Sequence, residues 1–233
     1  MAKVITIPYH PREWANRIHN TDSRWIVVVA HRRAGKTTMA LNHLQRDALK
    51  IKNSRWGYIS PTYKQSKFIA WDMIKQYAKV IPGVKFNESE LTVKYPNGSK
   101  LTLYGADYPD SLRGMGFWGV IFDEYSQQPS NIFSEIIRPA LSDHKGYAIW
   151  IGTPKGKNEF YRLYQQGLSD DNWLTLLLTV KDTRLISEEE LNEAKKVMTD
   201  DEFNQEFNCS FEASIKGAYY SREISTARIE NRI

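Results

Sequence analysis

The stretch from Ala30 to Thr38, which contains His-Arg-Arg-Ala-Gly-Lys-Thr, constrains the fold of this chain more than any other. An apolar run over 25–30 leads into it, and a helix-compatible run over 39–44 follows. A buried strand, a tight loop and a helix that opens on Gly-Lys-Thr form the layout of a phosphate-binding loop. At the junction where the strand ends and the helix begins, unpaired backbone N–H groups and the helix dipole attract an anion. The stretch therefore predicts a turn that holds phosphate.

Within this loop, each residue type has an expected role. Gly35 lets the backbone approach a phosphate, Lys36 is placed to reach the β- and γ-phosphates, and the Thr37 hydroxyl to ligate Mg²⁺. Two guanidinium groups ahead of them suit a triphosphate as well. The predicted nucleotide-binding residues are Arg32, Arg33, Ala34, Gly35, Lys36, Thr37 and Thr38. Because Ala30 stands where the standard pattern has its first glycine, an ordinary strand-to-helix turn containing Gly-Lys is the alternative.

A second stretch supplies the carboxylates that such a site needs. The apolar strand Val120-Ile121-Phe122 ends in Asp123 and Glu124. Asp123 is expected to hold the Mg²⁺ shell, and Glu124 to orient and deprotonate the attacking water. Solvated acids at a strand end are common, but an acidic pair in a chain that also carries Gly-Lys-Thr after an earlier strand predicts nucleotide hydrolysis. ATP and Mg²⁺ are the expected substrate and cofactor.

Two more segments carry candidate functional residues. Arg113 lies in a glycine-rich turn, from which an arginine can neutralise transition-state charge in its own or a neighbouring subunit; a plain turn arginine is the alternative. Thr153, in Gly-Thr-Pro after a later strand, is expected to couple hydrolysis to motion, although this is also ordinary turn chemistry. The cations that follow are either a nucleic-acid contact or a solvated basic face: Lys155, Lys157 and Arg162.

The order of apolar segments predicts an α/β fold. Expected strands alternate with expected helices over residues 1–180, which is typical of a mainly parallel sheet flanked by helices on both faces. A hairpin is expected across Pro96-Asn97-Gly98. Strands are expected over 25–30, 56–60, 91–94, 100–104, 118–122, 147–151 and 173–180, and helices over 12–19, 39–48, 70–81, 131–141 (broken by Pro139) and 159–166. Ligands bind at the carboxyl ends of such strands.

After Val180 the pattern changes to short helices. Ser187 to Glu190 has the pattern of a capping box, and the apolar face of the helix it opens is expected to contain Leu191, Ala194, Val197 and Met198. A second capping box begins at Thr199. We therefore expect a P-loop ATPase domain over 1–180 and a small helical lid or linker subdomain over 181–233, whose last part, 215–233, is a linker.

Composition restricts the compartment and the partners. The net charge of +5 suits a polyanion such as nucleic acid, although many globular proteins carry as much. Cys209 is the only cysteine, so no disulfide can form within the chain and no cysteine cluster for zinc exists, which fits a reducing cytoplasm. The N-terminus is unlike a signal peptide, no apolar run approaches the roughly 20 residues of a membrane span, and five scattered histidines predict no metal site.

Together these separated stretches resemble one family, the large terminase subunit of tailed bacteriophages, the ATPase that packages DNA into procapsids. Residues 25–38 are similar to the arginine-rich, variant phosphate loop of that family. The Arg113-Gly114 turn, followed by the strand that ends in Asp123 and Glu124, resembles its Arg-Gly turn and acidic strand, and 151–154 resembles its coupling motif. Two later segments resemble the connection from its ATPase domain to its nuclease domain: 203–207 and 217–220.

The resemblance implies a P-loop NTPase fold of the ASCE, RecA-like type. It implies that Lys36 and Thr37 bind nucleotide and metal, that Asp123 belongs to the metal shell and that Glu124 is the catalytic base. Arg113 matches an arginine proposed to act in trans between ring subunits. The implied function is translocation of double-stranded DNA by a ring, usually a pentamer, docked on the procapsid portal in the host cytoplasm. A small terminase subunit selects the DNA, and the isolated chain is expected to be mostly monomeric.

Two departures from the family leave alternatives open. The family often has a glutamine near the adenine, and Pro11-Arg12-Glu13 occupies that region here. Its second half is an RNase H-like nuclease; this chain ends at Ile233, so we expect an ATPase-domain fragment without endonuclease activity. A helicase-like, DNA-stimulated ATPase is one alternative, although it normally needs a second motor domain. A non-hydrolysing DNA-binding assembly module is the other, and the presence of both acids argues against it.

Overall fold

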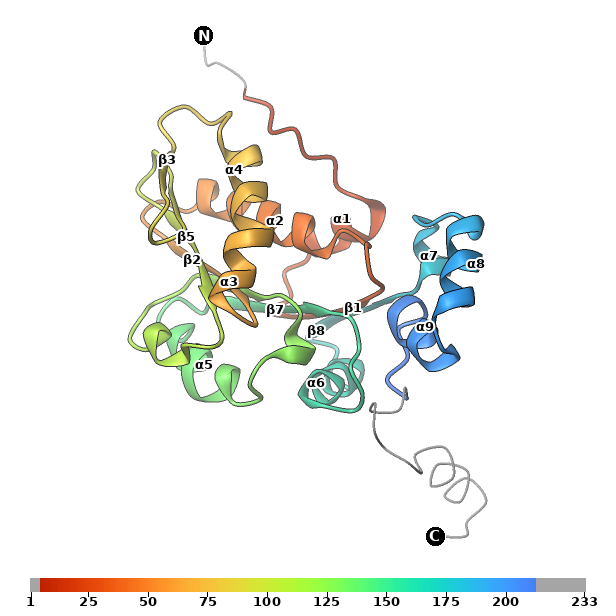
Figure 1. The fold of residues 1–233 in the computed structure, drawn as a ribbon. Helices are drawn as coiled ribbons and strands as arrows, with labels where there is room; N and C mark the ends of the chain where they lie inside the picture. The colour runs from red at the N-terminus through yellow and green to blue at the C-terminus, as the bar shows by residue number, and fades with distance from the viewer. Residues whose placement is uncertain (1–4, 213–233) are drawn as a thin grey trace.

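The computed structural model describes residues 5–212, whose strands form one eight-stranded sheet with helices on both faces (Figure 1). The strand order is β3-β4-β5-β2-β6-β7-β1-β8. The strands are β1 (Trp25–Ala30), β2 (Arg55–Ser60), β3 (Lys85–Asn87), β4 (Thr92–Lys94), β5 (Lys100–Gly105), β6 (Gly119–Phe122), β7 (Tyr147–Gly152) and β8 (Trp173–Leu178). The sequence pattern does not predict β3, because three residues are too few to show a period.

The sheet is parallel except at one edge, which confirms the expected α/β class. Neighbouring strands pair in parallel along the part of the sheet ordered β5, β2, β6, β7, β1 and β8. At the other edge, β3 pairs antiparallel with β4, and β4 pairs antiparallel with β5. The β4–β5 hairpin forms across Asn97-Gly98 as expected. Residues Ile26 to Ala30 of β1 are all buried, because helices cover both faces of the sheet there.

Two hydrophobic clusters lie on the two faces of the sheet. The first cluster includes residues of α1 (Glu13–His19), α2 (Lys36–Lys50), the π-helical η1 (Ser66–Trp71) and α4 (Asp72–Ala78). The short helix α3 (Tyr63–Gln65), which leads into η1, has no buried residue. The second cluster packs against η2 (Pro109–Leu112), η3 (Tyr125–Gln127), η4 (Ile132–Ile137), α5 (Arg138–Ala140) and α6 (Glu159–Leu168). No helix among residues 5–212 is long and apolar enough to cross a membrane.

Two helical segments differ from expectation. The helix expected over 70–81 begins earlier, with α3 and η1, and α4 ends at Ala78. Pro139 does not break the helix over 131–141, because η4 runs directly into α5 and Pro139 lies in the first turn of α5. The helix ends one residue later, at Ala140.

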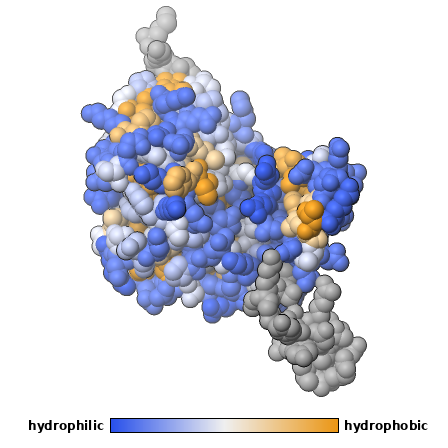
Figure 2. Space-filling view, viewed as in Figure 1, coloured by the Kyte–Doolittle hydropathy of each residue, from blue (hydrophilic) through white to orange (hydrophobic). Residues whose placement is uncertain are grey.

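The chain after β8 forms three short helices at one end of the sheet (Figure 1): α7 (Val180–Thr183), α8 (Glu188–Val197) and α9 (Asp200–Phe207). Thr199 caps α9 with a full capping box, as expected. The expected apolar face of α8 is not buried, since no α8 residue is buried and Val197 is 85% exposed. Figure 2 shows hydrophobic surface on this helical unit. The expected linker over 215–233 and the segment 217–220 lie outside the described residues.

Candidate active site

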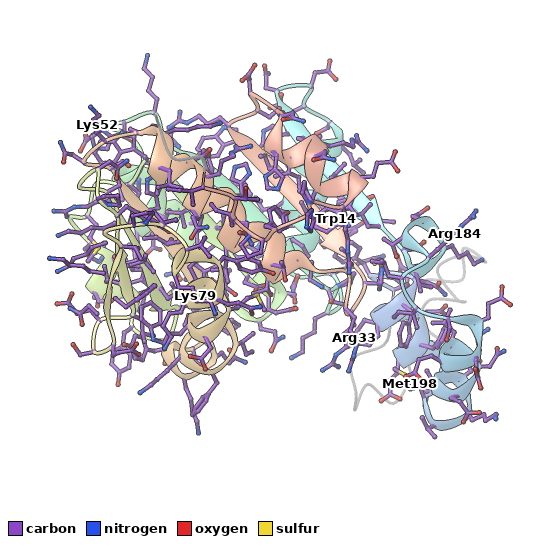
Figure 3. The ribbon with its side chains drawn as sticks, turned by 90° about the horizontal axis from the view of Figure 1, so that it is seen from above. Trp14, Arg33, Lys52, Lys79, Arg184 and Met198 are labelled. Carbon is purple, nitrogen blue, oxygen red and sulfur yellow. The ribbon has the colours of Figure 1, made fainter. Side chains whose placement is uncertain are left out.

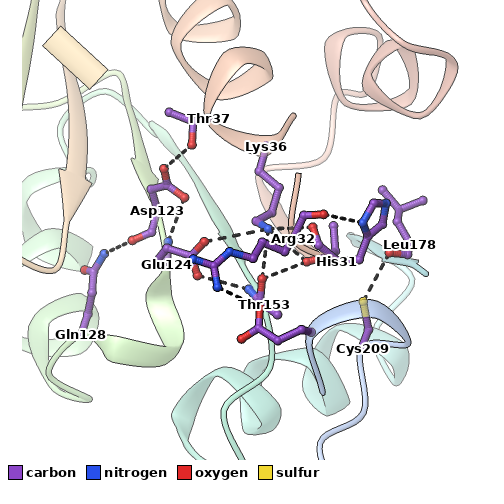
Figure 4. A network of polar contacts seen from close by, with 12 residues as sticks. His31, Arg32, Lys36, Thr37, Asp123, Glu124, Gln128, Thr153, Leu178 and Cys209 are labelled. Atoms are coloured by element: carbon purple, nitrogen blue, oxygen red, sulfur yellow. Dashed lines mark hydrogen bonds and ion pairs between the residues drawn. The ribbon is translucent and has the colours of Figure 1, made fainter. Parts of the chain in front are cut away.

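The residues that follow three adjacent strands meet in one site (Figure 4). In the sheet, β7 lies between β6 and β1. Asp123 and Glu124 follow β6, Thr153 follows β7, and residues 31–35 connect β1 to α2. The predicted phosphate loop, acidic pair and coupling threonine therefore come together at the carboxyl edge of the sheet, where parallel α/β folds bind ligands.

The loop over 31–35 is a tight turn whose backbone enters the left-handed region twice. The φ angle is 64° at Arg33 and 88° at Gly35, which is the N-cap of α2. Glycine adopts this conformation without steric cost. The N-cap residue Gly35 provides no side-chain cap, and no side chain among residues 5–212 accepts a hydrogen bond from the first N–H groups of α2. The dipole of this 15-residue helix points its positive end at the same place. The turn is therefore built to receive an anion.

Arg12, from the segment before α1, lies against this loop. Its Nη1 donates to the Ala34 carbonyl at 2.5 Å, and a Cβ added to Gly35 would lie 3.2 Å from the same nitrogen. Arg12 belongs to the Pro-Arg-Glu stretch, which occupies the region where the resembled terminase family often has a glutamine near the adenine. The sequence gives no signal for this contact, because 22 residues separate the two partners.

Lys36 is the cation at the centre of the site, and it is only 6% exposed. Its Nζ donates to the carbonyls of Ala30 and His31 and to Thr153 Oγ1, each at 3.1 Å. Glu124 Oε1 lies 3.9 Å from the same nitrogen. The Thr153 hydroxyl in turn donates to the Ala30 carbonyl at 3.2 Å. Three acceptors and one carboxylate therefore fix the position of the ammonium group.

Asp123 is a buried carboxylate that accepts several hydrogen bonds. Oδ2 accepts from the Thr37 hydroxyl at 2.7 Å and from the Tyr58 phenol, and Oδ1 accepts from the Glu124 backbone N–H at 2.9 Å. Burial and then the negative charge of Asp123 raise the pKa of Tyr58 well above its usual value, so the phenol remains a donor. The Thr37 hydroxyl and the Asp123 carboxylate are neighbouring hard oxygen ligands, which fit Mg²⁺.

Glu124 has a backbone conformation that a glutamate rarely adopts. Its φ and ψ are 49° and 47°, in the left-handed region, directly after β6. Such a conformation costs an L-residue about 1–2 kcal/mol and is concentrated at functional sites. Oε2 accepts from the Thr153 backbone N–H at 3.4 Å. Burial raises the pKa of Glu124, and Asp123 adds to this while Lys36 opposes it. A carboxylate with raised proton affinity is suited to accept a proton from water.

The phosphate loop is also tied to the helices after β8. The buried His31 ring places Nε2 2.6 Å from Thr183 Oγ1, and burial lowers the pKa of His31. The Arg32 N–H donates to the Glu206 carbonyl at 3.0 Å, and its guanidinium lies 3.7 Å from the Glu206 carboxylate. The Cys209 thiol donates to the Leu178 carbonyl at 3.3 Å. The helical unit is therefore attached directly to the loop.

Three predicted residues do not join this cluster. The Arg33 side chain is exposed and points outward (Figure 3). The Thr38 hydroxyl donates to Met73 Sδ at 3.5 Å, toward α4. Arg113 pairs through Nε with Asp110 Oδ1 at 2.7 Å and, within residues 5–212, has no hydrogen bond or ion pair with the loop or the acids.

Two residues that support Asp123 are not evident from the sequence. Tyr58 lies on β2, and only the parallel pairing of β2 with β6 brings its hydroxyl to Asp123. Gln128 Nε2 donates to the Asp123 carbonyl at 2.7 Å and to the Ile59 carbonyl at 2.9 Å. A polar residue shortly after the acidic pair is the only sequence signal for Gln128, and Tyr58 gives none.

The fold and the site define the class of protein. A mainly parallel sheet with a Gly-Lys-Thr loop after β1 and an acidic pair after β6 is a P-loop nucleoside triphosphatase. The chain belongs to a narrower family, the phage terminase large subunits, because residues 27–227 match the model described as terminase large subunit, T4likevirus-type, N-terminal. The resemblance that the sequence motifs indicate is thereby confirmed.

Individual relatives agree with this family. The large terminase subunit of Escherichia phage T5 is 27% identical over 204 residues, covering 84% of this chain and 46% of that protein. The large terminase subunit of Thermus virus P23-45 is 28% identical over 178 residues, covering 68% of this chain and 37% of that protein. The solved structure of the large terminase ATPase domain of Thermus phage P74-26 matches with a TM-score of 0.78 at 26% sequence identity. The match covers 88% of this chain and 95% of that domain. The chain thus spans less than half the length of these two curated relatives.

Proposed function

We propose that this chain is the ATP-hydrolysing motor domain of a large terminase, which translocates double-stranded viral DNA into a procapsid. The observation that carries the proposal is the convergence of Lys36, Thr37, Asp123 and Glu124 in one site. Family membership supports it, as does the likeness to the P74-26 ATPase domain, 95% of which this chain covers. The domain assignment belongs to the same proposal: an ATPase domain over 1–180 and a lid or linker subdomain over 181–233.

Each residue of the cluster has a proposed role in hydrolysis. Lys36 and the N–H groups at the start of α2 bind the phosphates of ATP. Arg32 and Arg33, whose exposed side chains lie outside the cluster, are proposed as further phosphate contacts. Thr37 and Asp123 hold Mg²⁺, which when bound neutralises charge on the β- and γ-phosphates. Glu124 orients a water molecule and takes its proton. Thr153 contacts both Lys36 and Glu124, so it is placed to transmit the loss of the γ-phosphate to β7.

Arg113 is proposed to act on a neighbouring subunit. It is exposed on a turn away from the cluster of its own chain, a placement that suits action in trans. The proposed assembly is a ring, a pentamer, docked on the portal of the procapsid, with a small terminase subunit as a further partner. The isolated chain is expected to be mostly monomeric.

The pH dependence of hydrolysis is expected to report the raised pKa of Glu124. A general base works only when ionised, so turnover falls as the pH drops through the pKa of Glu124. Because burial raises that pKa, the midpoint of the acid limb is expected above 4.5, the ordinary value for glutamate. Steady-state phosphate release across a pH series measures it, with circular dichroism at each pH to exclude unfolding. A midpoint at or below 4.5 in folded protein would count against Glu124 as the base.

Tyr58→Phe is expected to weaken metal-dependent turnover without unfolding the chain. The phenol donates to Asp123 Oδ2, the same oxygen that accepts from Thr37, so its loss leaves the carboxylate less firmly oriented. Changes to residues that orient metal ligands typically cost about 10–100-fold in affinity or activity. A Mg²⁺ titration of turnover measures the effect, with Tyr95→Phe, another buried tyrosine, as the control. An unchanged Mg²⁺ requirement would show that Tyr58 is structural only.

One experiment separates the proposal from its alternatives: ATP hydrolysis measured against protein concentration, with and without duplex DNA and procapsids. A packaging motor is expected to show turnover per subunit that rises with protein concentration and again with procapsids. A helicase-like ATPase would respond to DNA alone at any protein concentration. A non-hydrolysing assembly module would show no turnover under any condition.

A further inference from the structure

Four cations stand in one row across four neighbouring strands of the sheet. Lys85 of β3 is opposite Lys94 of β4, Lys94 is opposite Lys100 of β5, and Lys100 is opposite Arg55 of β2. All four residues are exposed. Residues in register on neighbouring strands project from the same face of a sheet. We call Lys85, Lys94, Lys100 and Arg55 the cation row.

The members of the cation row have no direct carboxylate partner in the described part of the chain. None of its four members forms an ion pair with a carboxylate among residues 5–212, whereas Lys157 and Arg162, two cations that the sequence also brings to notice, pair with Glu212 and Glu159. Like charges directly opposite each other destabilise a sheet. Lysine on an edge strand can prevent edge-to-edge pairing, but that explains only Lys85 on β3, since Lys100 and Arg55 belong to interior strands.

The dimensions of the cation row match a phosphate backbone. Three steps between strands about 4.8 Å apart give a row roughly 14 Å long. One strand of duplex DNA presents a phosphate about every 3.4 Å along the helix axis, so that length faces about four phosphates.

The cation row lies at the end of the sheet opposite the candidate active site. Arg55 and Lys100 are the first residues of β2 and β5, whereas the phosphate loop and the acids follow the carboxyl ends of their strands. Arg55 and Lys100 also line a hollow of about 500 Å³, and its lining includes the carboxylates Glu90 and Asp107. Those carboxylates repel phosphate, so the hollow itself is not part of the proposed contact surface. A polyanion on the cation row would not compete with nucleotide.

We propose that the cation row is a contact site for the phosphate backbone of duplex DNA. The identity of the polyanion rests on the proposed function, whereas the site itself rests on the strand register and the missing counter-charges. Contacts of this kind are independent of base sequence and release counterions, so they are strongest at low salt.

The test is binding of a fluorescently labelled DNA duplex, without nucleotide, at a series of salt concentrations. The variant is Lys94→Gln with Lys100→Gln; the control is Lys79→Gln with Lys181→Gln, which removes the same charge from two exposed positions off the row (Lys79 is labelled in Figure 3). Each lost phosphate contact lowers the slope of log K against log salt by about 0.9, so the variant is expected to lose about 2 from the slope. Binding should weaken equally for unrelated duplex sequences, and the control should match the unmodified chain.

A thermal unfolding scan of the same variants separates a binding role from a structural one. Removing opposed like charges is expected to leave the unfolding temperature equal or higher. An unchanged salt slope, an equal loss in the control, or no duplex binding by the unmodified chain at low salt would overturn the proposal. So would self-association of the variant with its DNA slope unchanged, because the row would then serve only to protect the sheet edge.

The proposed function is tested separately, by ATP hydrolysis in the absence of DNA. If the chain hydrolyses ATP but the salt slope of its DNA binding does not depend on the cation row, only this inference is refuted. If the salt slope of DNA binding depends on the cation row but the chain does not hydrolyse ATP, only the proposed function is refuted.

Discussion

Replacing Glu124 by glycine is expected to abolish ATP hydrolysis without weakening the fold. Its φ of 49° costs an L-residue about 1–2 kcal/mol, whereas glycine is free of that cost but loses about 0.5–1 kcal/mol in backbone entropy. The two terms oppose each other, so together they should change the free energy of unfolding by no more than about 1.5 kcal/mol. Loss of a general base typically costs about 10²–10⁴-fold in rate. Asp123 cannot replace it, because Thr37, Tyr58 and a backbone N–H already engage its oxygens.

Glu124→Gln is the matched control for the glycine variant. It keeps the size of the side chain and the left-handed backbone but cannot take a proton. Both variants should bind ATP-γ-S in a calorimetric titration and release no phosphate, and the glutamine variant should unfold at or below the temperature of the glycine variant. Turnover retained by either variant would remove Glu124 from the mechanism. A large loss of stability in the glycine variant alone would show that the backbone is not strained there.

Lys36→Ala is expected to eliminate nucleotide binding as well as turnover. The ammonium is held by two carbonyls and the Thr153 hydroxyl beneath the start of α2, so it is the fixed positive charge toward which phosphates would bind. Its loss also removes the cation that opposes the rise in the pKa of Glu124, so Glu124 becomes harder to ionise. The carbonyls and hydroxyl left without this donor are expected to cost about 1–3 kcal/mol of stability.

Lys50→Ala is the control on the same helix. Lys50 lies at the other end of α2, and its side chain is 63% exposed with a carboxylate 4.0 Å away, so its removal should change neither binding nor turnover. Titration with ATP-γ-S and a thermal unfolding scan of both variants measure the two effects. If the Lys36 variant bound nucleotide as tightly as the Lys50 variant, the loop would not be the phosphate site.

The parts of the site that depend on local sequence could be predicted. The run 25–30, Gly35 and the helix that starts at Lys36 form one contiguous strand, turn and helix, so their spacing alone places the phosphate loop. Asp123 and Thr153 follow buried apolar strands, and parallel strands present their carboxyl ends at one edge. That rule was enough to place them beside the loop without knowledge of the strand order.

The parts that depend on tertiary contacts could not be predicted. Arg12 reaches Ala34, and Tyr58 reaches Asp123, only because the fold brings together segments 22 and 65 residues apart. The apolar spacing on α8 predicted a shared apolar face, but it could not predict that Val197 on this face is exposed, because periodicity shows which residues share a face and not whether anything covers it. Arg113 has no local feature that distinguishes action on its own site from action on a neighbour, and that role stays a prediction.

The most direct test of ATP hydrolysis at this site is phosphate release in a single turnover, with the unmodified chain in excess over ATP. We expect release that requires Mg²⁺, stops on addition of EDTA and is absent from Glu124→Gln, although that variant still binds the nucleotide. Tight binding of ATP with no phosphate release from the unmodified chain, or equal release from Glu124→Gln, would contradict the assignment.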